Sequence, residues 1–219
     1  MESDLFDSST NREEEQFEEE LTAAEVLQKL EEAWLNEKHS PELQDSKIEI
    51  VECLLDQINT MEENLVKLKK GDVRIPVHRM EIQRIKFMIN SYLRHRLSKI
   101  QKNIFSITKP DSDNPDKMTA EEAEFAGNYR QLLQTHFDSL ILRHIPGHWD
   151  PTKVSPVTSG PALDSAVFVS VKKSVAGVDI KDATDLGRDD SVDFSEGNQH
   201  IVQYSAVSHL VDSEHLQLI

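Results

Sequence analysis

Cysteine, glycine and long apolar runs are scarce in this chain of 219 residues, and each scarcity excludes a class of protein. Cys53 is the only cysteine, so the chain has no internal disulfide framework and suits a reducing compartment. The seven glycines form no Gly-x-Gly, and no Gly-Lys-Ser or Gly-Lys-Thr occurs, which excludes both common phosphate-binding loops. No apolar run reaches the roughly 18 residues of a membrane-spanning helix. The acidic N-terminus fits neither a signal nor a transit peptide.

Patterns for catalysis and metal binding are also missing. No His-Glu-x-x-His or Gly-x-Ser-x-Gly occurs, and Cys53 lies in a helical run without a visible base. His144 and His148 are separated by Pro146 and Gly147, which keep them off one helical face. We therefore expect no enzymatic activity, no metal and no cofactor.

Charge is present in excess, and it is unevenly distributed. The 40 acidic and 24 basic residues give a formal net charge of −16, which argues against a general coat for nucleic acid or anionic membrane. Residues 1–20 hold nine acids and one arginine, residues 66–102 hold eleven bases and two acids, and residues 176–196 hold seven acids and two bases. This segregation predicts separate surfaces for separate partners.

The first twenty residues are expected to form a disordered acidic tail. Leu5, Phe6 and Phe17 are its only large apolar residues, too few to offset the entropy of ordering. One interpretation is a solubilising tail. The other is a short docking motif at residues 4–7 that folds onto a groove of an adaptor protein.

Helical periodicity predicts a helical bundle domain over residues 21–145. Two capping boxes, Thr22 with Glu25 and Thr119 with Glu122, mark the starts of the first and last helices. Proline or glycine follows the expected ends. The expected helices cover 22–39, 43–70, 76–105 and 119–145.

The third expected helix has apolar residues on two sides. Its roughly thirty residues give a length of about 45 Å, more than a small helical domain needs. Met80, Phe87 and Leu97 leave its main apolar stripe and fall towards the opposite side. Since a two-sided helix is usually buried between two layers, we expect a partner protein to cover this second side.

Arg96 falls inside the apolar stripe of the same helix, where an arginine needs an anion or a route to solvent. On the wheel of the second helix, Glu62 also falls inside the stripe. We predict an ion pair of Arg96 within a helix interface, with Glu62 as one candidate partner. Snorkelling of the arginine to solvent is the alternative.

A change of period near residue 164 predicts a second domain. Prolines recur between residues 146 and 163, which we interpret as a linker with some stiffness. Residues 164–219 alternate in polarity, and this small β-rich domain is near the lower size limit for an independent core, so we expect it to need docking. The expected strands are 165–171, 191–194, 199–204 and 216–219, with Gly177, Gly187 and Gly197 in turns.

Several segments resemble the Sld5 family of GINS complex subunits, in the same order along residues 22–219. The acidic tail and the loops near 106–117 and 172–190 match poorly. The segments that carry the resemblance are Ala33-Trp-Leu-Asn-Glu-Lys-His-Ser-Pro-Glu-Leu43, Ile50-Val-Glu-Cys53, Met61-Glu-Glu-Asn-Leu65, Tyr92-Leu-Arg-His-Arg-Leu-Ser-Lys-Ile100, Asp193-Phe-Ser-Glu-Gly-Asn-Gln-His-Ile-Val-Gln-Tyr204 and Leu216-Gln-Leu-Ile219.

The resemblance implies a heterotetramer of four related subunits, each with a helical and a small β-rich domain. It implies that this complex joins Cdc45 and the MCM ring ATPase in the replicative helicase of eukaryotes, in initiation and at the replication fork. It also implies a nuclear, chromatin-associated location, with a cytoplasmic fraction allowed, and a C-terminal domain that is important for assembly.

The leading hypothesis is therefore a non-catalytic scaffold subunit that contacts three other GINS subunits, the MCM ring and Cdc45. The alternative is a nucleic-acid-binding module that uses the basic residues 66–102, although direct contact with DNA stays open. The residues expected at protein interfaces are Trp34, Met80, Phe87, Tyr92, Arg94, Arg96, Leu97, Phe168, Tyr204, Leu216 and Ile219.

Overall fold

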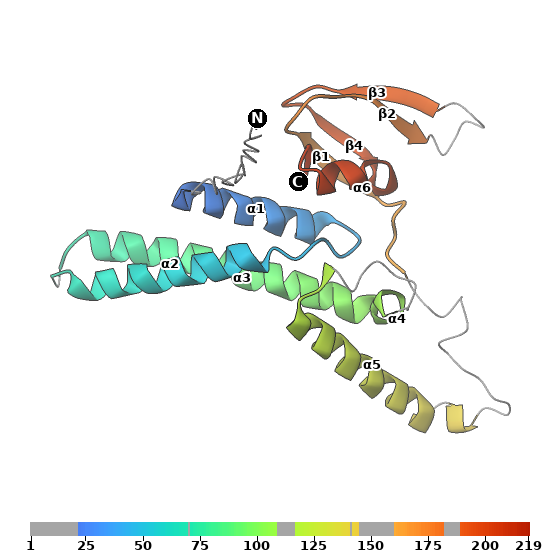
Figure 1. Ribbon diagram of the computed structural model, residues 1–219, viewed down its shortest axis with the longest axis horizontal. Helices are drawn as coiled ribbons and strands as arrows, with labels where there is room; N and C mark the ends of the chain where they lie inside the picture. Colours follow the sequence, from blue (N-terminus) through green and yellow to red (C-terminus); the bar gives the residue numbers. More distant parts are fainter. Residues whose placement is uncertain (1–21, 70, 109–116, 141, 145–159, 182–188) are drawn as a thin grey trace, which may run out of the picture.

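Helices make up the N-terminal part of the molecule, and antiparallel strands with one further helix make up its C-terminal part (Figure 1). This confirms the predicted fold class. The predicted tail, the loop residues 109–116 and most of the predicted linker lie outside the residues that the structure describes. The structure is a computed structural model that describes residues 22–69, 71–108, 117–140, 142–144, 160–181 and 189–219.

Helix α1 (Ala23–His39) starts at the predicted capping box. The backbone N–H of Glu25 donates to Thr22 Oγ1 at 3.4 Å, and the N–H of Thr22 donates to Glu25 Oε2 at 2.7 Å. The helix ends at His39, and Ser40 after it has an extended backbone that suits the proline that follows. Both predicted boundaries of this helix are confirmed.

Helices α2 (Ile48–Lys67) and α3 (Arg74–Lys102) run antiparallel as a long hairpin (Figure 1). Gly71 has a φ of +98°, a left-handed conformation that glycine adopts without a steric penalty in the tight turn between them. The predicted third helix was slightly too long. It ends at Lys102, and a separate short helix α4 (Ile104–Ile107) follows.

The predicted second helix was also too long, because residues 43–47 are not helical. The backbone of Gln44 is used elsewhere: its carbonyl accepts a hydrogen bond from Arg96 Nη1 at 2.7 Å, and its N–H donates to Glu37 Oε2 at 3.3 Å. Leu43 and Gln44 are both buried. A segment whose backbone groups have such partners needs no helical hydrogen bonds.

Helix α5 (Ala120–Leu140) begins at the second predicted capping box. Glu122 N–H donates to Thr119 Oγ1 at 3.2 Å, and Thr119 N–H donates to Glu122 Oε2 at 3.0 Å. The first half of α5 packs on the end of α3 and on α4 through Ala126. Its second half points away from the bundle, and a short 3₁₀ turn (Leu142–His144) follows (Figure 1).

The C-terminal part contains two small antiparallel sheets. In the three-stranded sheet, β1 (Ala166–Val171) lies between β4 (Gln199–Gln203) and β5 (Leu216–Leu218). The predicted strands in these three places are confirmed. The two-stranded sheet pairs β2 (Val175–Lys181) with β3 (Asp189–Phe194), which contains the predicted strand 191–194.

Two elements of the C-terminal part were not predicted. Strand β2 occupies a region expected to be a loop, and Gly177 lies at a bulge within β2 instead of in a turn. Helix α6 (Tyr204–Asp212) follows β4 directly, so Tyr204 is helical and does not end a strand. The spacing of Tyr204, Val207 and Leu210, all buried, is the helical signal that was missed.

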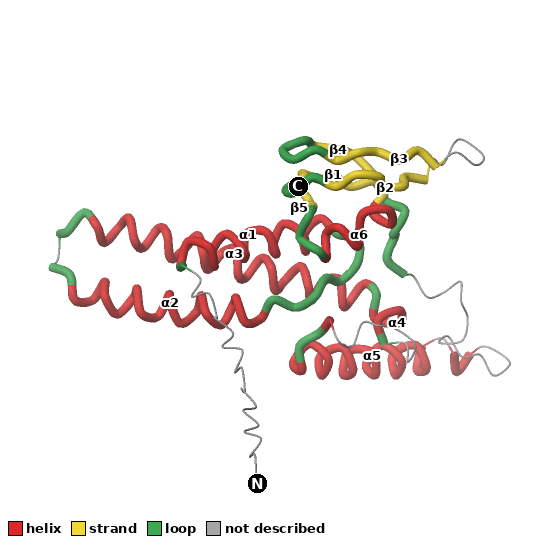
Figure 2. Tube along the Cα trace, turned by 45° about the horizontal axis from the view of Figure 1, so that its top comes forward, coloured by secondary structure: helices red, strands yellow, loops and turns green. Residues whose placement is uncertain are grey.

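Each part of the chain has its own apolar core. Residues of α1, α2 and α3 form one cluster, and the ends of α3, α4 and α5 form a second with Leu43. The C-terminal core, which includes Val169, Phe194 and Leu218, draws only on residues 167–218. In Figures 1 and 2 the C-terminal part and α5 lie on opposite sides of the three long helices.

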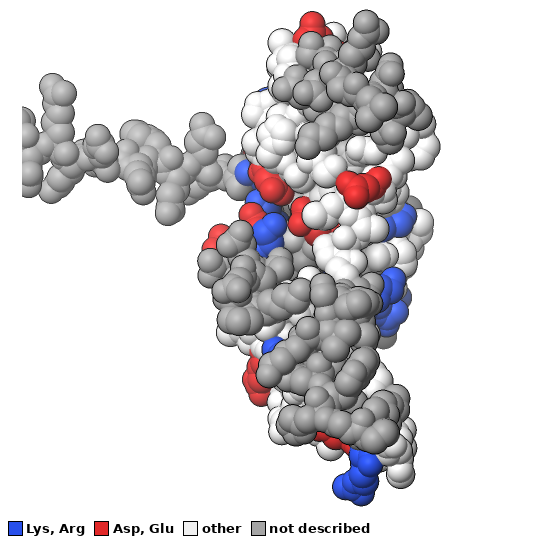
Figure 3. Space-filling view, turned by 90° about the vertical axis from the view of Figure 1, so that its right-hand side faces the viewer, with Lys and Arg blue, Asp and Glu red and all other residues white. Residues whose placement is uncertain are grey.

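Charges of both signs occur on the end of the molecule shown in Figure 3. The acidic and basic groups of the described residues lie there in small scattered groups, some of them directly beside groups of the opposite sign. The described part of this face therefore offers no continuous basic area to a nucleic-acid backbone.

Candidate protein interface

Large apolar side chains lie exposed on the second side of α3, as predicted. Met80 is 73% exposed and Phe87 is 63% exposed. Trp34 of α1 lies beside them: its ring meets Phe87 edge-on at 6.3 Å between centroids, and its Nε1 donates to Ser91 Oγ at 2.9 Å. We call Trp34, Met80 and Phe87 the α3 surface.

Basic side chains lie next to the α3 surface. Arg79 and Arg84 line a shallow apolar groove beside Met80 and Phe87, and Lys38 Nζ lies 5.6 Å from the centre of the Trp34 ring. An apolar centre with a polar rim is the usual anatomy of a protein–protein interface, and aromatic anchors contribute most of its energy.

Arg96, nine residues after Phe87 on α3, is fully buried. Its Nε and Nη2 donate to the two oxygens of Glu122 at 2.8 and 2.9 Å, and its Nη1 donates to Glu37 Oε2 at 3.1 Å. The carbonyls of Gln44 and Lys117 each accept a further hydrogen bond at 2.7 Å. One side chain thus joins α1, α3, α5 and the 40–47 loop, which confirms the predicted ion pair within a helix interface.

The candidate partner of Arg96 was wrong. Glu62 lies on the outside of α2, where it pairs with Lys86 Nζ at 2.6 Å. Glu122 was predicted only as a capping residue, and it serves both the cap and the ion pair. Glu37 had no predicted role.

Lys99 adds a second buried cation. Its Nζ lies 2.7 Å from Glu37 Oε1 and donates to Ser40 Oγ and to the Glu42 carbonyl. We call Glu37, Arg96, Lys99 and Glu122 the buried ionic cluster. Two bases against two acids give it no net formal charge, which buried charges require.

The pKa shifts in the cluster follow from burial and pairing. Burial opposes the charge of Arg96, but the hydrogen bonds to Glu122 and the charge of Glu37 outweigh it and raise the pKa of the guanidinium. Burial acts against ionisation of Glu122, yet the hydrogen bond from Arg96 and that from the Thr119 backbone hold its carboxyl pKa below the usual value. Burial lowers the pKa of Lys99, and Glu37 opposes that shift.

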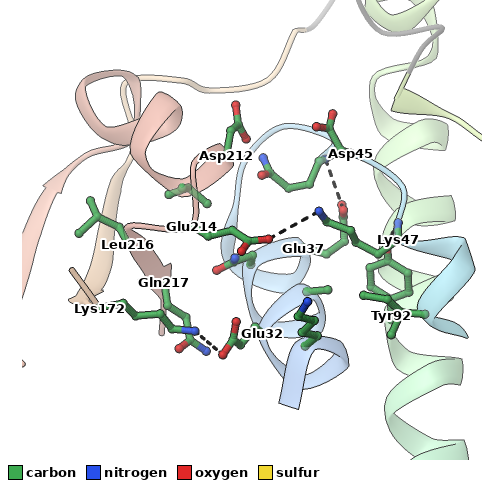
Figure 4. A pocket seen from close by; sticks show the side chains of 16 residues that line it. Glu32, Glu37, Asp45, Lys47, Tyr92, Lys172, Asp212, Glu214, Leu216 and Gln217 are labelled. Atoms are coloured by element: carbon green, nitrogen blue, oxygen red, sulfur yellow. Dashed lines mark hydrogen bonds and ion pairs between the residues drawn. The ribbon is translucent and has the colours of Figure 1, made fainter. Parts of the chain in front are cut away.

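The C-terminal part meets the bundle through a polar contact (Figure 4). The Tyr204 hydroxyl donates to Glu42 Oε1 at 2.7 Å and accepts from Gln44 Nε2 at 2.7 Å. The N–H of Leu218 donates to Asn36 Oδ1 at 2.9 Å. We call this region the interdomain contact.

Two ion pairs and a small cavity complete the interdomain contact. Lys172 pairs with Glu32, and Lys47 Nζ lies 3.8 Å from Glu214 Oε1 (Figure 4). A cavity of about 150 Å³ between α1, the 40–47 loop and the C-terminal part is lined by charged side chains of both signs.

In the described residues, no cluster of His, Cys, Asp or Glu suits a metal ion, and no helix is long and apolar enough to cross a membrane.

Comparison with known proteins identifies the family. The profile of the "GINS complex protein helical bundle domain" matches residues 34–141, and the profile of the "DNA replication complex GINS protein SLD5 C-terminus" matches residues 161–219. The chain belongs to the SLD5 family of GINS proteins. The first match runs from Trp34 to the end of α5, and the second covers the C-terminal sheets.

Relatives of this SLD5 family member match along nearly the whole chain. The DNA replication complex GINS protein SLD5 of Rattus norvegicus is 41% identical over 204 residues, covering 91% of each chain. The Xenopus laevis protein of the same description is 40% identical over 223 residues, covering 100% of each chain. The Homo sapiens protein is 37% identical over 204 residues.

The predicted interface residues of this SLD5 family member divide into two groups. Four of them, Tyr92, Arg96, Tyr204 and Leu216, are buried by the chain itself, so we reassign them from partner contact to internal packing. Their apolar or paired polar surroundings explain this, since each fills a core or a hydrogen-bonded cluster. For the exposed or half-buried residues, contact with a partner stays a prediction. These are Trp34, Met80, Phe87, Arg94, Leu97, Phe168 and Ile219.

The structure brings two subsets of the predicted residues together. Trp34, Met80 and Phe87 form the α3 surface. Phe168 and Ile219 meet on the outer face of the three-stranded sheet, where the Ile219 N–H donates to the Phe168 carbonyl at 3.0 Å. Sequence reasoning missed Ile201, which is exposed and pairs directly with Phe168 across the strands. Its place in an alternating strand was the available signal.

Proposed function

We propose that this chain is a non-catalytic structural subunit of the GINS complex that acts in DNA replication. The observation that carries the proposal is identity of about 40% to proteins of that description over at least 91% of the chain. The exposed α3 surface supports it, because apolar side chains of this size are usually covered in a working assembly. The chain would act by presenting fixed surfaces to its partners.

We further propose that the partners are three other GINS subunits, and that the assembly works with Cdc45 and the MCM ring in the nucleus. ATP hydrolysis would then take place in the ring. The buried ionic cluster fits such a role, because it fixes three helices and one loop relative to one another. Adaptor docking by residues 1–20 stays a prediction, since the tail lies outside the described residues.

Co-expression with the other three GINS subunits tests the proposal. We expect all four chains to co-purify in equal amounts. Deletion of residues 164–219 should prevent this, since the deletion removes β1 and with it the sheet and the interdomain contact. Size-exclusion chromatography with mass spectrometry is the measurement. Equal recovery of the truncated chain with three partners would show that the C-terminal domain has no part in assembly.

The structure weakens the case for a nucleic-acid-binding module at residues 66–102. Of the ten bases in this stretch that the structure describes, five lie within ion-pair distance of a carboxylate, so much of the positive charge is neutralised inside the chain. Two of these five, Arg96 and Lys99, are also buried. Affinity for nucleic acid rests on free basic groups that can reach phosphates.

Charge reversal of exposed basic residues away from the α3 surface tests whether the chain acts as a structural subunit or as a nucleic-acid-binding module. We expect Lys67→Glu, Lys69→Glu and Lys102→Glu together to leave both subunit co-purification and DNA affinity of the complex within about twofold, because these side chains hold no part of the core. Fluorescence anisotropy with a labelled oligonucleotide measures the affinity. A fall of more than about tenfold with assembly intact would favour the nucleic-acid-binding module.

A further inference from the structure

The contact between the two parts of the chain lacks an apolar core. Among the described residues, the C-terminal apolar cluster and the two bundle clusters share no member. We therefore infer, in place of the expectation from size alone that this domain needs docking, that it can keep its core whether or not it touches the bundle. An interface within a chain that is not large and hydrophobic normally permits relative domain motion.

The attractions across the interdomain contact are few and partly open to solvent. The side chains of Lys47 and Glu214 are 47% and 68% exposed, and those of Lys172 and Glu32 are 29% and 24% exposed. Exposed ion pairs of this kind contribute little and are screened by salt. Two buried groups of the C-terminal part make hydrogen bonds across this contact in the described residues: the Tyr204 hydroxyl, which is held by Glu42 and Gln44, and the Leu218 N–H, which donates to Asn36 Oδ1.

Repulsion acts across the same contact. Asp45 of the 40–47 loop and Asp212 of α6 both line the cavity. Partial burial raises the pKa of the Asp212 carboxyl, Lys117 lowers it, and the negative charges of Asp45 and Glu42 raise it again, with a net rise. Ionised Asp212 thus opposes docking, and the attractive groups must outweigh it.

We propose that the C-terminal domain is held on the bundle by a reversible polar latch and detaches as an intact folded unit. The latch consists of the hydrogen bonds of Tyr204 with Glu42 and Gln44 and of Leu218 with Asn36, together with the ion pairs Lys172–Glu32 and Lys47–Glu214. Detachment frees the Glu42 carboxylate, the Gln44 amide and the Tyr204 hydroxyl for polar groups of another protein. The latch lies within this chain alone, so it stands apart from the proposed function.

Spin labels on the full-length chain test the latch. In a Cys53→Ser background, labels at Glu31→Cys on α1 and Glu196→Cys in the β3–β4 turn report the distance between the two parts. We expect one narrow distance at an ionic strength of about 0.01 M and a second, longer population that grows at least tenfold by about 1 M, where the screening length falls from about 30 to about 3 Å. The double variant Tyr204→Phe, Glu32→Gln should show the longer population already at low salt.

Glu62→Gln is the matched control, because it removes an exposed ion pair of the same kind within the bundle. It should leave the distance distribution unchanged. Hydrogen exchange of the β1 amides reports whether the detached domain stays folded. A single narrow distance at every salt concentration and in the double variant would overturn the latch, and loss of β1 protection together with the longer distance would overturn detachment as a folded unit.

Discussion

Replacing Arg96 with methionine (R96M) should lower the free energy of unfolding by about 3–5 kcal/mol, the usual cost of removing one partner from a buried ion pair. The methionine fills much of the space but cannot satisfy Glu122, which loses two charge-assisted hydrogen bonds. The carbonyls of Gln44 and Lys117 lose their donor as well. Urea denaturation followed by circular dichroism measures the effect.

Arg94 provides the control on the same helix. Its side chain is exposed, and among the described residues no carboxylate lies within ion-pair distance of it. Arg94→Met should therefore change stability by no more than about 0.5 kcal/mol. Arg96→Lys should recover only part of the loss, because an ammonium cannot bind both oxygens of Glu122 in the planar fork geometry. An R96M chain within about 1 kcal/mol of the wild type would show that the cluster contributes little to stability.

The buried ionic cluster also links the bundle to the C-terminal domain. Arg96 holds the carbonyl of Gln44, and the side chain of Gln44 donates to the Tyr204 hydroxyl. Loss of Arg96 therefore removes the hydrogen bond that holds the backbone of Gln44, whose side chain binds Tyr204 in the latch. These contacts explain why residues 43–47, which were expected to be helical, are not: the backbone of Gln44 bonds to Arg96 and Glu37, and its side chain bonds to Tyr204.

The helices could be predicted where the signals are local. Both capping boxes specify helix starts from residues three apart, and both are present. The helical wheel also placed Arg96 correctly inside the bundle, because the face of a residue depends only on its own helix. Its partner could not be predicted this way. Glu62 pairs with Lys86, ten residues before Arg96, which is about 15 Å along α3.

In the C-terminal domain, local sequence patterns predicted some strands but missed other elements and could not predict the strand order. Alternation of polar and apolar residues revealed β1 and β4, but Gly177 and its bulge break the alternation in β2. Helix α6 is only nine residues long and follows β4 directly, so its helical spacing was missed when Tyr204 was assigned to the end of a strand. The order β4-β1-β5 depends on pairing between distant segments, which periodicity does not encode.

Placing charges on the α3 surface should abolish partner binding without unfolding the chain. We expect the double variant Met80→Asp, Phe87→Asp to bind the other GINS subunits at least about 100-fold more weakly, since aromatic anchors at an interface centre contribute about 2–4 kcal/mol. The variant should unfold within about 1 kcal/mol of the wild type, because both side chains point to solvent in the isolated chain. Co-purification and thermal unfolding are the two measurements.

Val66→Asp on α2 is the matched control, since Val66 is 86% exposed but lies outside the α3 surface. It should leave both measurements unchanged. The comparison separates two causes of lost binding: a general effect of added acid on a chain of net charge −16, and the loss of an apolar anchor at one place. Equal binding by all three proteins would mean that partners cover a different face. In that case the outer face of the three-stranded sheet, with Phe168, Ile201 and Ile219, is the next apolar surface available to them.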